Sequence, residues 1–180
     1  MHERRFKGRP DRLRSEERLA RLEVERVVDR CLEGTGIRRV LDIGTGTGVF
    51  AEAFSGRGCE VAGVDPNPDL LAEARRHVPE AEFSEATAEA LPFPDKQFDL
   101  AFIGAVLHET DDAVAALREA RRVTVHMVVV LEFPFVEEDE GPPLHHRLPP
   151  EAIEDLARQA GYALVQRLAL PCMDLYLMTP

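Results

Sequence analysis

The stretch VLDIGTGTG at residues 40–48 decides how this chain folds. It begins with a short apolar run, as expected for a buried strand of a parallel sheet. Gly44, Gly46 and Gly48 follow, and glycine lets the backbone turn sharply and approach a ligand closely because no Cβ intervenes. A helical pattern continues over residues 49–55. The stretch therefore predicts a strand, a tight glycine turn and a helix.

Strand and helix patterns alternate along most of the rest of the chain. We expect strands at residues 38–43, 60–64, 81–85, 98–103 and 125–132, and helices at residues 49–55, 67–77, 111–122 and 149–161. Two late strands, at residues 162–170 and 173–178, are joined by a link so short that they must form an antiparallel hairpin. The pattern predicts a doubly wound, Rossmann-like α/β fold with a seven-stranded, mostly parallel sheet.

The N-terminal part has its own pattern. Residues 1–10 are expected to form a flexible arm, and residues 11–32 a helix ended by Gly34 and Gly36. Its predicted apolar stripe consists of Ala20, Val24, Val27, Val28 and Cys31. We divide the chain into this segment, residues 1–34, and a ligand-binding domain at residues 35–180.

Composition narrows the classes of partner. The 180 residues carry a net charge of -11, and an acidic body repels a phosphate backbone, so we expect no nucleic-acid partner. No apolar run approaches the roughly 18 residues of a membrane span, and the first residues do not resemble a signal peptide. The three cysteines form no CxxC pair, so we expect a reducing cytoplasm and no cysteine-built metal site.

Asp42 indicates which ligand the glycine turn receives. In a doubly wound sheet the ligand lies beside the carboxyl end of the first strand, where Asp42 stands. A carboxylate there repels the pyrophosphate of a dinucleotide, whereas it suits S-adenosylmethionine (SAM), which carries an ammonium and a sulfonium. Gly48 also comes one place too early for the dinucleotide pattern GxGxxG, and no Lys-Ser/Thr pair follows the turn as in a P-loop.

Asp65 indicates that the ligand contains a nucleoside, but it does not distinguish SAM from NAD. It ends the second expected strand, where an acid can accept hydrogen bonds from ribose hydroxyls. Because NAD and SAM share that ribose, an NAD(P)-dependent oxidoreductase stays open as a less favoured alternative.

The sequence resembles the class I SAM-dependent methyltransferases, in particular the small-molecule group (methyltransferase type 11) that includes ubiquinone- and menaquinone-biosynthesis enzymes. The motifs that carry the resemblance lie at residues 40–48, 61–75, 86–102, 106–112 and 148–162. The resemblance implies SAM as cofactor, S-adenosylhomocysteine (SAH) as product and methyl transfer as the activity.

The resemblance also implies where the cofactor binds. It places cofactor contacts at Asp42, Gly44, Thr45, Gly46, Gly48, Asp65, Pro66, Asn67, Thr87, Ala88, Glu89 and Gly104. In this assignment Asp42 holds the amino group, Asp65 accepts from the ribose, and the Gly104 carbonyl meets the methionine end. Thr87 departs from the family, which commonly has an aspartate there, and a hydroxyl accepts a hydrogen bond more weakly than a carboxylate.

Catalytic residues are harder to predict, because methyl transfer depends mainly on proximity and orientation. His108, with Glu109 beside it, is the candidate base if the acceptor must lose a proton, although His108 could equally pack in its loop or cap the next helix. We expect the adjacent His145 and His146 to point apart and to share no metal ion. Four aromatic side chains could either form walls of the pocket or pack in the core: Phe6, Phe133, Phe135 and Tyr176.

The predicted function is in-line methyl transfer from SAM to a small molecule. We expect the acceptor to lie between residues 1–34, which form part of a lid, and the loops after the fourth and fifth strands. The main alternative is a non-catalytic SAM- or SAH-binding sensor or partner subunit, which Thr87 keeps open. We expect no membrane partner, while a homodimer stays open.

Overall fold

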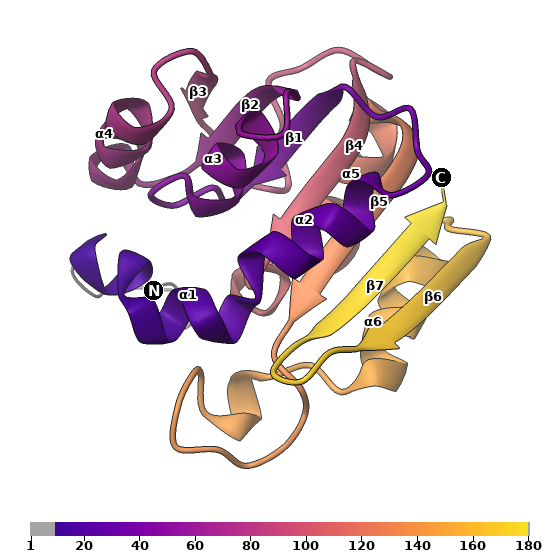
Figure 1. Cartoon of the computed structure of the whole chain (residues 1–180). Coiled ribbons are helices and arrows are strands. Elements are labelled where there is room, and N and C mark those ends of the chain that lie inside the picture. The colour runs from indigo at the N-terminus through magenta and orange to yellow at the C-terminus, as the bar shows by residue number, and fades with distance from the viewer. Residues whose placement is uncertain (1–9, 180) are drawn as a thin grey trace.

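The computed structural model describes residues 10–179 and contains a single seven-stranded sheet in the order β3-β2-β1-β4-β5-β7-β6 (Figure 1). The first five strands run parallel, and β7 is antiparallel to both β5 and β6. The strands are β1 (Arg39–Ile43), β2 (Glu60–Asp65), β3 (Glu82–Glu85), β4 (Phe98–Gly104), β5 (Thr124–Glu132), β6 (Leu164–Ala169) and β7 (Asp174–Thr179). The predicted doubly wound α/β fold is confirmed, with β7 inside the sheet and β6 at its edge.

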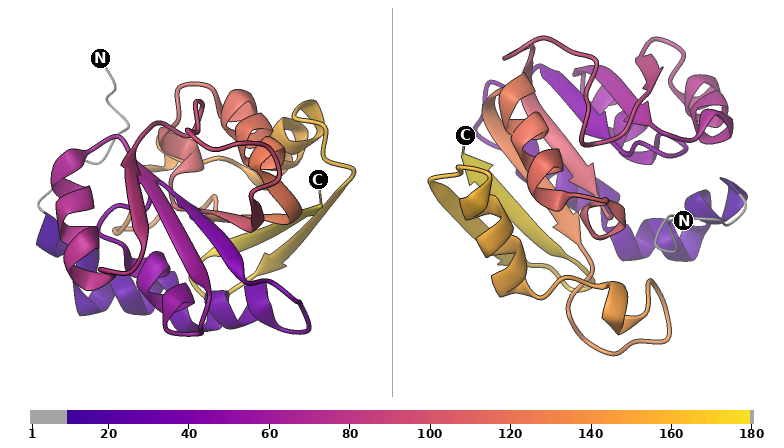
Figure 2. Two further views of the ribbon diagram at one scale, coloured as in Figure 1. Left: turned by 90° about the horizontal axis from the view of Figure 1, so that it is seen from above. Right: turned by 180° about the vertical axis from the view of Figure 1, so that it is seen from behind.

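Helices cover both faces of the sheet. They are α1 (Glu16–Leu22), α2 (Val24–Leu32), α3 (Val49–Ser55), α4 (Pro68–His77), α5 (Ala113–Val123) and α6 (Pro150–Gln159), with short 3-10 helices at Pro10–Arg14, Leu107–Glu109 and Leu144–His146. Seen from behind, α5 and α6 lie on the face opposite to α2 (Figure 2).

Alternating strand residues build a separate core on each face. Within β5, Val128 and Val130 pack into the core under α5 and α6, while Val129 and Leu131 pack into the core under α2, α3 and α4. Side chains of successive strand residues point to opposite faces, so a strand buried on both faces must be apolar at every position. This explains why the central strands appear as continuous apolar runs in the sequence.

The N-terminal helix differs from the prediction. The expected single helix is divided at Glu23, whose backbone is left-handed (φ 50°), so that α1 and α2 meet at an angle. Val27, Val28 and Cys31 are buried as expected, but Ala20 is exposed and Leu22 is buried in its place. The break lets α2 lie along the sheet while α1 lies beyond the carboxyl ends of the central strands (Figure 1).

No helix among residues 10–179 has both the length and the apolar character needed to cross a membrane.

The start of α5 offers a test of the local structure. The Asp112 carboxylate caps this helix by accepting a hydrogen bond from the Ala115 backbone N–H at 2.9 Å. We expect Asp112→Ala to lower the free energy of unfolding by about 1 kcal/mol, because it leaves that N–H without its partner. Asp155→Ala, in an exposed part of α6, is the control and should change stability by less than about 0.5 kcal/mol. Equal effects in urea denaturation would contradict the capping role.

Candidate functional site

The glycine turn joins β1 to α3 at the centre of the sheet. Gly44, Gly46 and Gly48 have φ angles of 70°, 54° and 79°, in the left-handed region that side chains with a Cβ rarely adopt. A Cβ on Gly44 would lie 2.5 Å from a methyl carbon of Val106, so this position also needs glycine for space. The turn is therefore built for close approach of its backbone, as the sequence predicts.

Asp42, which lies in β1 just before the turn, stabilises the turn. Its side chain is buried, and Oδ2 accepts hydrogen bonds from the Thr45 hydroxyl at 2.6 Å and from the Ala51 backbone N–H at 3.2 Å. Burial raises the pKa of Asp42 to about 7, although those two hydrogen bonds act in the opposite direction and the nearby Asp65 carboxylate adds to the increase. A carboxyl group in this state gains strongly from a nearby cation.

Asp65 binds the turn from the neighbouring strand. Its Oδ2 accepts from the Gly46 backbone N–H at 2.9 Å, and its Oδ1 accepts from the Asn67 backbone N–H at 2.8 Å. Asn67 in turn caps α4 by accepting from the N–H groups of Asp69 and Leu70. This carboxylate, together with the Thr45 N–H that donates to the Val64 carbonyl at 2.9 Å, fixes the turn to the carboxyl end of β2.

A cavity of about 390 Å³ opens above this turn, within the range typical of small-molecule sites. Of the predicted cofactor residues, those that line it are Asp42, Gly44, Thr45, Gly46, Asp65, Pro66, Asn67, Thr87, Ala88, Glu89 and Gly104. The structure thus brings together residues from the ends of β1, β2, β3 and β4.

Gly48 is the predicted cofactor residue that does not line the cavity. A Cβ there would lie 3.1 Å from Cβ of Ala74, so the absence of a side chain lets α3 approach α4 closely. Its position supports a packing role.

Several cavity residues were not predicted from the sequence. Leu13, Arg18 and Leu22 line it from the N-terminal segment, and Val106 and Thr110 line it from the segment after β4. Only the i, i+4 spacing of Arg18 and Leu22, which places them on one side of α1, could have suggested the first group.

The cavity is rich in acid. Asp42, Asp65, Glu89 and Glu109 line it, and Arg18 is the one basic residue among the described lining residues. Burial opposes ionisation of Glu89, but backbone N–H groups, including those of Asp111 and Asp112, outweigh it and keep the pKa of Glu89 low. A cationic ligand therefore meets a complementary field.

The structure does not bring His108 to the cavity. Its ring is buried, with Nδ1 2.8 Å from Oε2 of Glu132, and its backbone N–H donates to Oε1 of Glu132 at 3.1 Å. Burial works against the charged imidazole, but the Glu132 carboxylate outweighs it and raises the pKa of His108. The buried pair connects the carboxyl ends of β4 and β5.

The other candidate aromatic and histidine residues lie elsewhere. Tyr176 and Phe133 are buried in the two cores, and Phe135 is exposed, whereas Phe6 lies outside the described residues. The rings of His145 and His146 do not point apart as predicted, because a 3-10 turn brings their centroids to 4.3 Å. Within residues 10–179, no group of three or more His, Cys, Asp or Glu side chains is placed to hold a metal ion.

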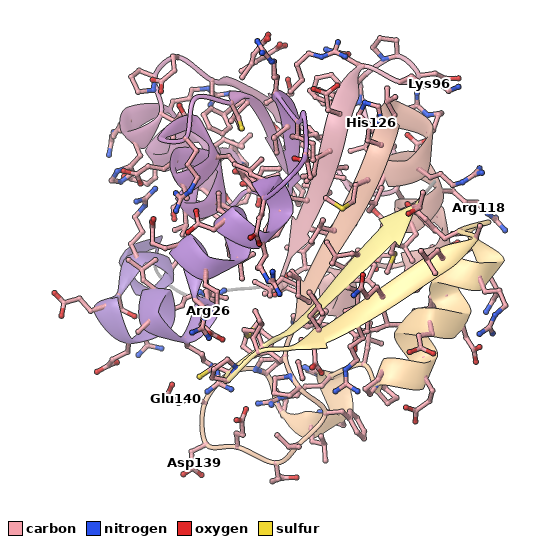
Figure 3. The ribbon with its side chains drawn as sticks, turned by 45° about the vertical axis from the view of Figure 1, so that its right-hand side comes forward. Arg26, Lys96, Arg118, His126, Asp139 and Glu140 are labelled. Atoms are coloured by element: carbon pink, nitrogen blue, oxygen red, sulfur yellow. The ribbon has the colours of Figure 1, made fainter. Side chains whose placement is uncertain are left out.

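A loop at residues 133–147 is fixed to α1. The buried Arg147 guanidinium donates to the backbone carbonyls of Pro134, Val136, Glu140 and Pro142 and forms an ion pair with Glu138 at 2.7 Å. Arg21 of α1 pairs with the same Glu138 carboxylate. The outer part of the loop, with Asp139 and Glu140, extends away from the sheet (Figure 3).

The residues present fit SAM. The glycine backbone can lie against a ligand without a phosphate, and the acidic lining suits an ammonium and a sulfonium. The Thr47 hydroxyl is buried at the cavity without a hydrogen-bond partner among the described residues, and such a group favours a polar ligand.

The sequence of this chain is similar to those of known proteins. A family model described as a methyltransferase domain matches residues 41–127. The demethylmenaquinone methyltransferase of Thermus thermophilus is 44% identical over 117 residues, which are 61% of this chain and 53% of the relative. The malonyl-[acyl-carrier protein] O-methyltransferase of Enterobacter lignolyticus is 31% identical over 150 residues, 76% of this chain and 59% of the relative. The chain thus spans little more than half the length of either relative.

A solved structure shows the same fold. A SAM-dependent methyltransferase from Aquifex aeolicus has a TM-score of 0.84, with 97% of this chain and 100% of that chain covered, at 22% identity.

The titration of Asp42 predicts how stability depends on pH. The pKa of Asp42 is about 7 in the folded protein and 3.8 in the unfolded chain. At a pH between these two values the folded protein keeps the proton on Asp42, whereas the unfolded chain has lost it. Stability from this group is therefore greatest below the lower pKa and decreases as pH rises to about 7. We expect the free energy of unfolding of the wild type, relative to Asp42→Asn, to fall between about pH 4.5 and 7 and to level off above, as measured in urea. A difference that does not change with pH would contradict the assigned pKa.

Proposed function

We propose that the chain is a class I SAM-dependent methyltransferase that transfers a methyl group from SAM to a small-molecule acceptor, and its similarity to methyltransferases supports this. The observation that carries the proposal is the cavity itself. It joins the glycine turn to residues of α1 and of the segment after β4, so that one space can hold both a nucleoside ligand and an acceptor.

The glycine turn and Asp42 would hold the methionine part of SAM. The backbone of Gly44, Thr45 and Gly46 lies at the cavity wall, and the Gly104 carbonyl at the end of β4 would face the same part. The Asp42 carboxyl, with a pKa of about 7, would ionise fully when the ammonium group lies nearby.

The nucleoside part would lie against the ends of β2 and β3. A carboxylate can accept about four hydrogen bonds, so ribose hydroxyls can join the two backbone N–H groups that already donate to Asp65. Pro66 and Asn67 would flank the adenine. Thr87, Ala88 and Glu89 would supply its polar contacts.

Methyl transfer requires little of the protein beyond positioning the acceptor relative to SAM. When bound, SAM supplies an electrophilic methyl group: the acceptor atom forms a bond to this carbon as the S–C bond breaks, and that electron pair stays on sulfur. The protein must hold the acceptor about 3 Å from the methyl group and in line with the S–C bond. A base is needed only where the acceptor carries a proton.

The N-terminal segment would form part of the lid over the acceptor. Leu13, Arg18 and Leu22 line the cavity, and Arg21 connects α1 to the loop at residues 133–147 through Glu138. This contact would hold the two sides of the acceptor space together.

We assign His108 a positioning role within this function. The His108–Glu132 pair would fix the segment after β4, whose residues Val106, Glu109 and Thr110 line the cavity. The base role suggested by the sequence stays a prediction.

The identity of the acceptor is proposed only as a small molecule. The two curated relatives are named for different acceptors, a demethylmenaquinone and a malonyl group on a carrier protein, and the chain spans only part of each.

Asp65 provides the mutational test of the cofactor site. We expect Asp65→Ala to weaken SAM and SAH binding about tenfold or more in calorimetry, because hydrogen bonds to a charged acceptor each contribute about 1.5–3 kcal/mol. Glu73→Ala, which removes an acid from the outer face of α4, is the control and should bind as the wild type does. Unchanged SAM affinity in Asp65→Ala would contradict the site.

Methyl transfer itself is tested with methyl-labelled SAM and a metabolite extract. The expected result is a labelled small molecule, identified by mass. Tight SAH binding without any labelled product would favour the non-catalytic sensor, and tight NAD binding without SAM binding would favour an oxidoreductase.

A further inference from the structure

Arg18 presents an unpaired guanidinium to the cavity. It lies in the first turn of α1 and lines the cavity together with Glu109, Thr110 and Leu22. Other arginines of the N-terminal segment have partners: Arg14 pairs with Glu52, and Arg21 pairs with Glu138. Among residues 10–179, no carboxylate lies within ion-pair distance of the Arg18 guanidinium.

The surroundings of Arg18 disfavour an unpaired charge. Burial lowers the pKa of Arg18, and Glu109 compensates only in part, from beyond ion-pair distance. The Arg18 side chain is half-buried, so water can still reach its guanidinium, and a bound anion would add the charged partner that no described residue supplies.

The position of Arg18 separates it from the glycine turn. Arg14, one helical turn earlier, donates to the Thr47 backbone carbonyl at 2.7 Å and so lies over the turn. The charged neighbours of Arg18 are Glu109, in the segment after β4, and Arg21, which contacts the loop after β5. Glu109 itself lines the cavity, so Arg18 faces the part of the cavity formed by the segment after β4.

We propose that Arg18 is a specificity-determining residue that binds a carboxylate of the methyl acceptor, so that the acceptor is a small organic acid. The inference rests on the proposed function and narrows its substrate class. A guanidinium matches a carboxylate in geometry as well as charge, because two N–H groups can donate to its two oxygens.

The charge of Arg18 distinguishes it within the cavity. It is the one basic residue among the described residues that line the cavity, so an anionic acceptor would find its complementary charge there. Loss of this charge should therefore reduce turnover of an anionic acceptor strongly, while a neutral acceptor would be little affected.

The test uses Arg18→Gln, Arg18→Lys and a control, Arg118→Gln, whose exposed side chain lies on α5 on a different side of the molecule (Figure 3). A metabolite extract is separated on an anion-exchange resin into a retained, anionic fraction and a flow-through fraction. Each fraction is incubated with methyl-labelled SAM and each variant, and SAH binding is measured separately by calorimetry.

We expect wild-type protein to label products of the anionic fraction. Arg18→Gln should reduce that rate about 30-fold or more, the loss expected when one partner of a buried charge pair is removed, while its SAH dissociation constant stays within about threefold of wild type. Arg18→Lys should retain an intermediate rate, and Arg118→Gln should behave as wild type.

Four results would overturn the inference. Label only in flow-through products would show a neutral or cationic acceptor, and an unchanged rate in Arg18→Gln would show that Arg18 is not needed. A parallel loss of SAH affinity in Arg18→Gln would assign Arg18 to the carboxylate of the cofactor. If the wild-type protein binds SAH but labels neither fraction, the proposed function fails and this inference fails with it.

Discussion

Two buried carboxylates, Asp42 and Asp65, determine the geometry of the site. Asp42 accepts from Thr45 and Ala51, and Asp65 accepts from Gly46 and Asn67, so the glycine turn is bound on two sides before any ligand is present. Glycine makes the left-handed turn accessible, but it also leaves the backbone free to adopt other conformations. The hydrogen bonds to the two acids, together with the backbone bond from Thr45 to Val64, hold one of these conformations. The same acids would then meet the charged and polar groups of the cofactor, so structure and binding depend on the same atoms.

The part of the cavity beyond the glycine turn is built differently. Its lining comes from segments far apart in sequence, α1 and the segment after β4, and α1 is in turn joined to the loop at residues 133–147. Glu138 lies between Arg21 and Arg147, and the ring of Phe133 lies within 6 Å of both guanidinium groups at 5.6 and 5.5 Å. Residues 133–147 are thus ordered around the buried Arg147 as well as the buried Phe133 ring.

The parts of the structure that follow from local rules were predictable from the sequence. The strand, turn and helix at residues 39–55 were predicted almost to the residue, because apolar runs and glycines mark them directly. The division of the N-terminal helix was not predictable. Glu23 adopts a left-handed conformation that its residue type disfavours, while its carboxylate accepts from the Cys172 backbone N–H, 149 residues away in the chain.

The residues of the site divide in the same way, into those that local sequence identifies and those that only the tertiary fold identifies. Asp42 and Asp65 were identified because they end predicted strands, and strand ends meet at one edge of a parallel sheet. The position of His108 depends on Glu132, which ends a different strand, and their pairing appears only when β4 and β5 lie side by side. Arg18 belongs to a helix with many charged residues, and only the tertiary fold distinguishes it from its neighbours.

SAM binding at the glycine turn that joins β1 to α3 is tested most directly by backbone amide NMR. Titration of the labelled protein with SAH should shift the amide signals of Gly44, Gly46, Asp65 and residues 87–89, while those of β6 stay in place. Equal titration with NAD should leave these signals unchanged. Shifts confined to other parts of the chain, or the same shifts with NAD, would contradict the account.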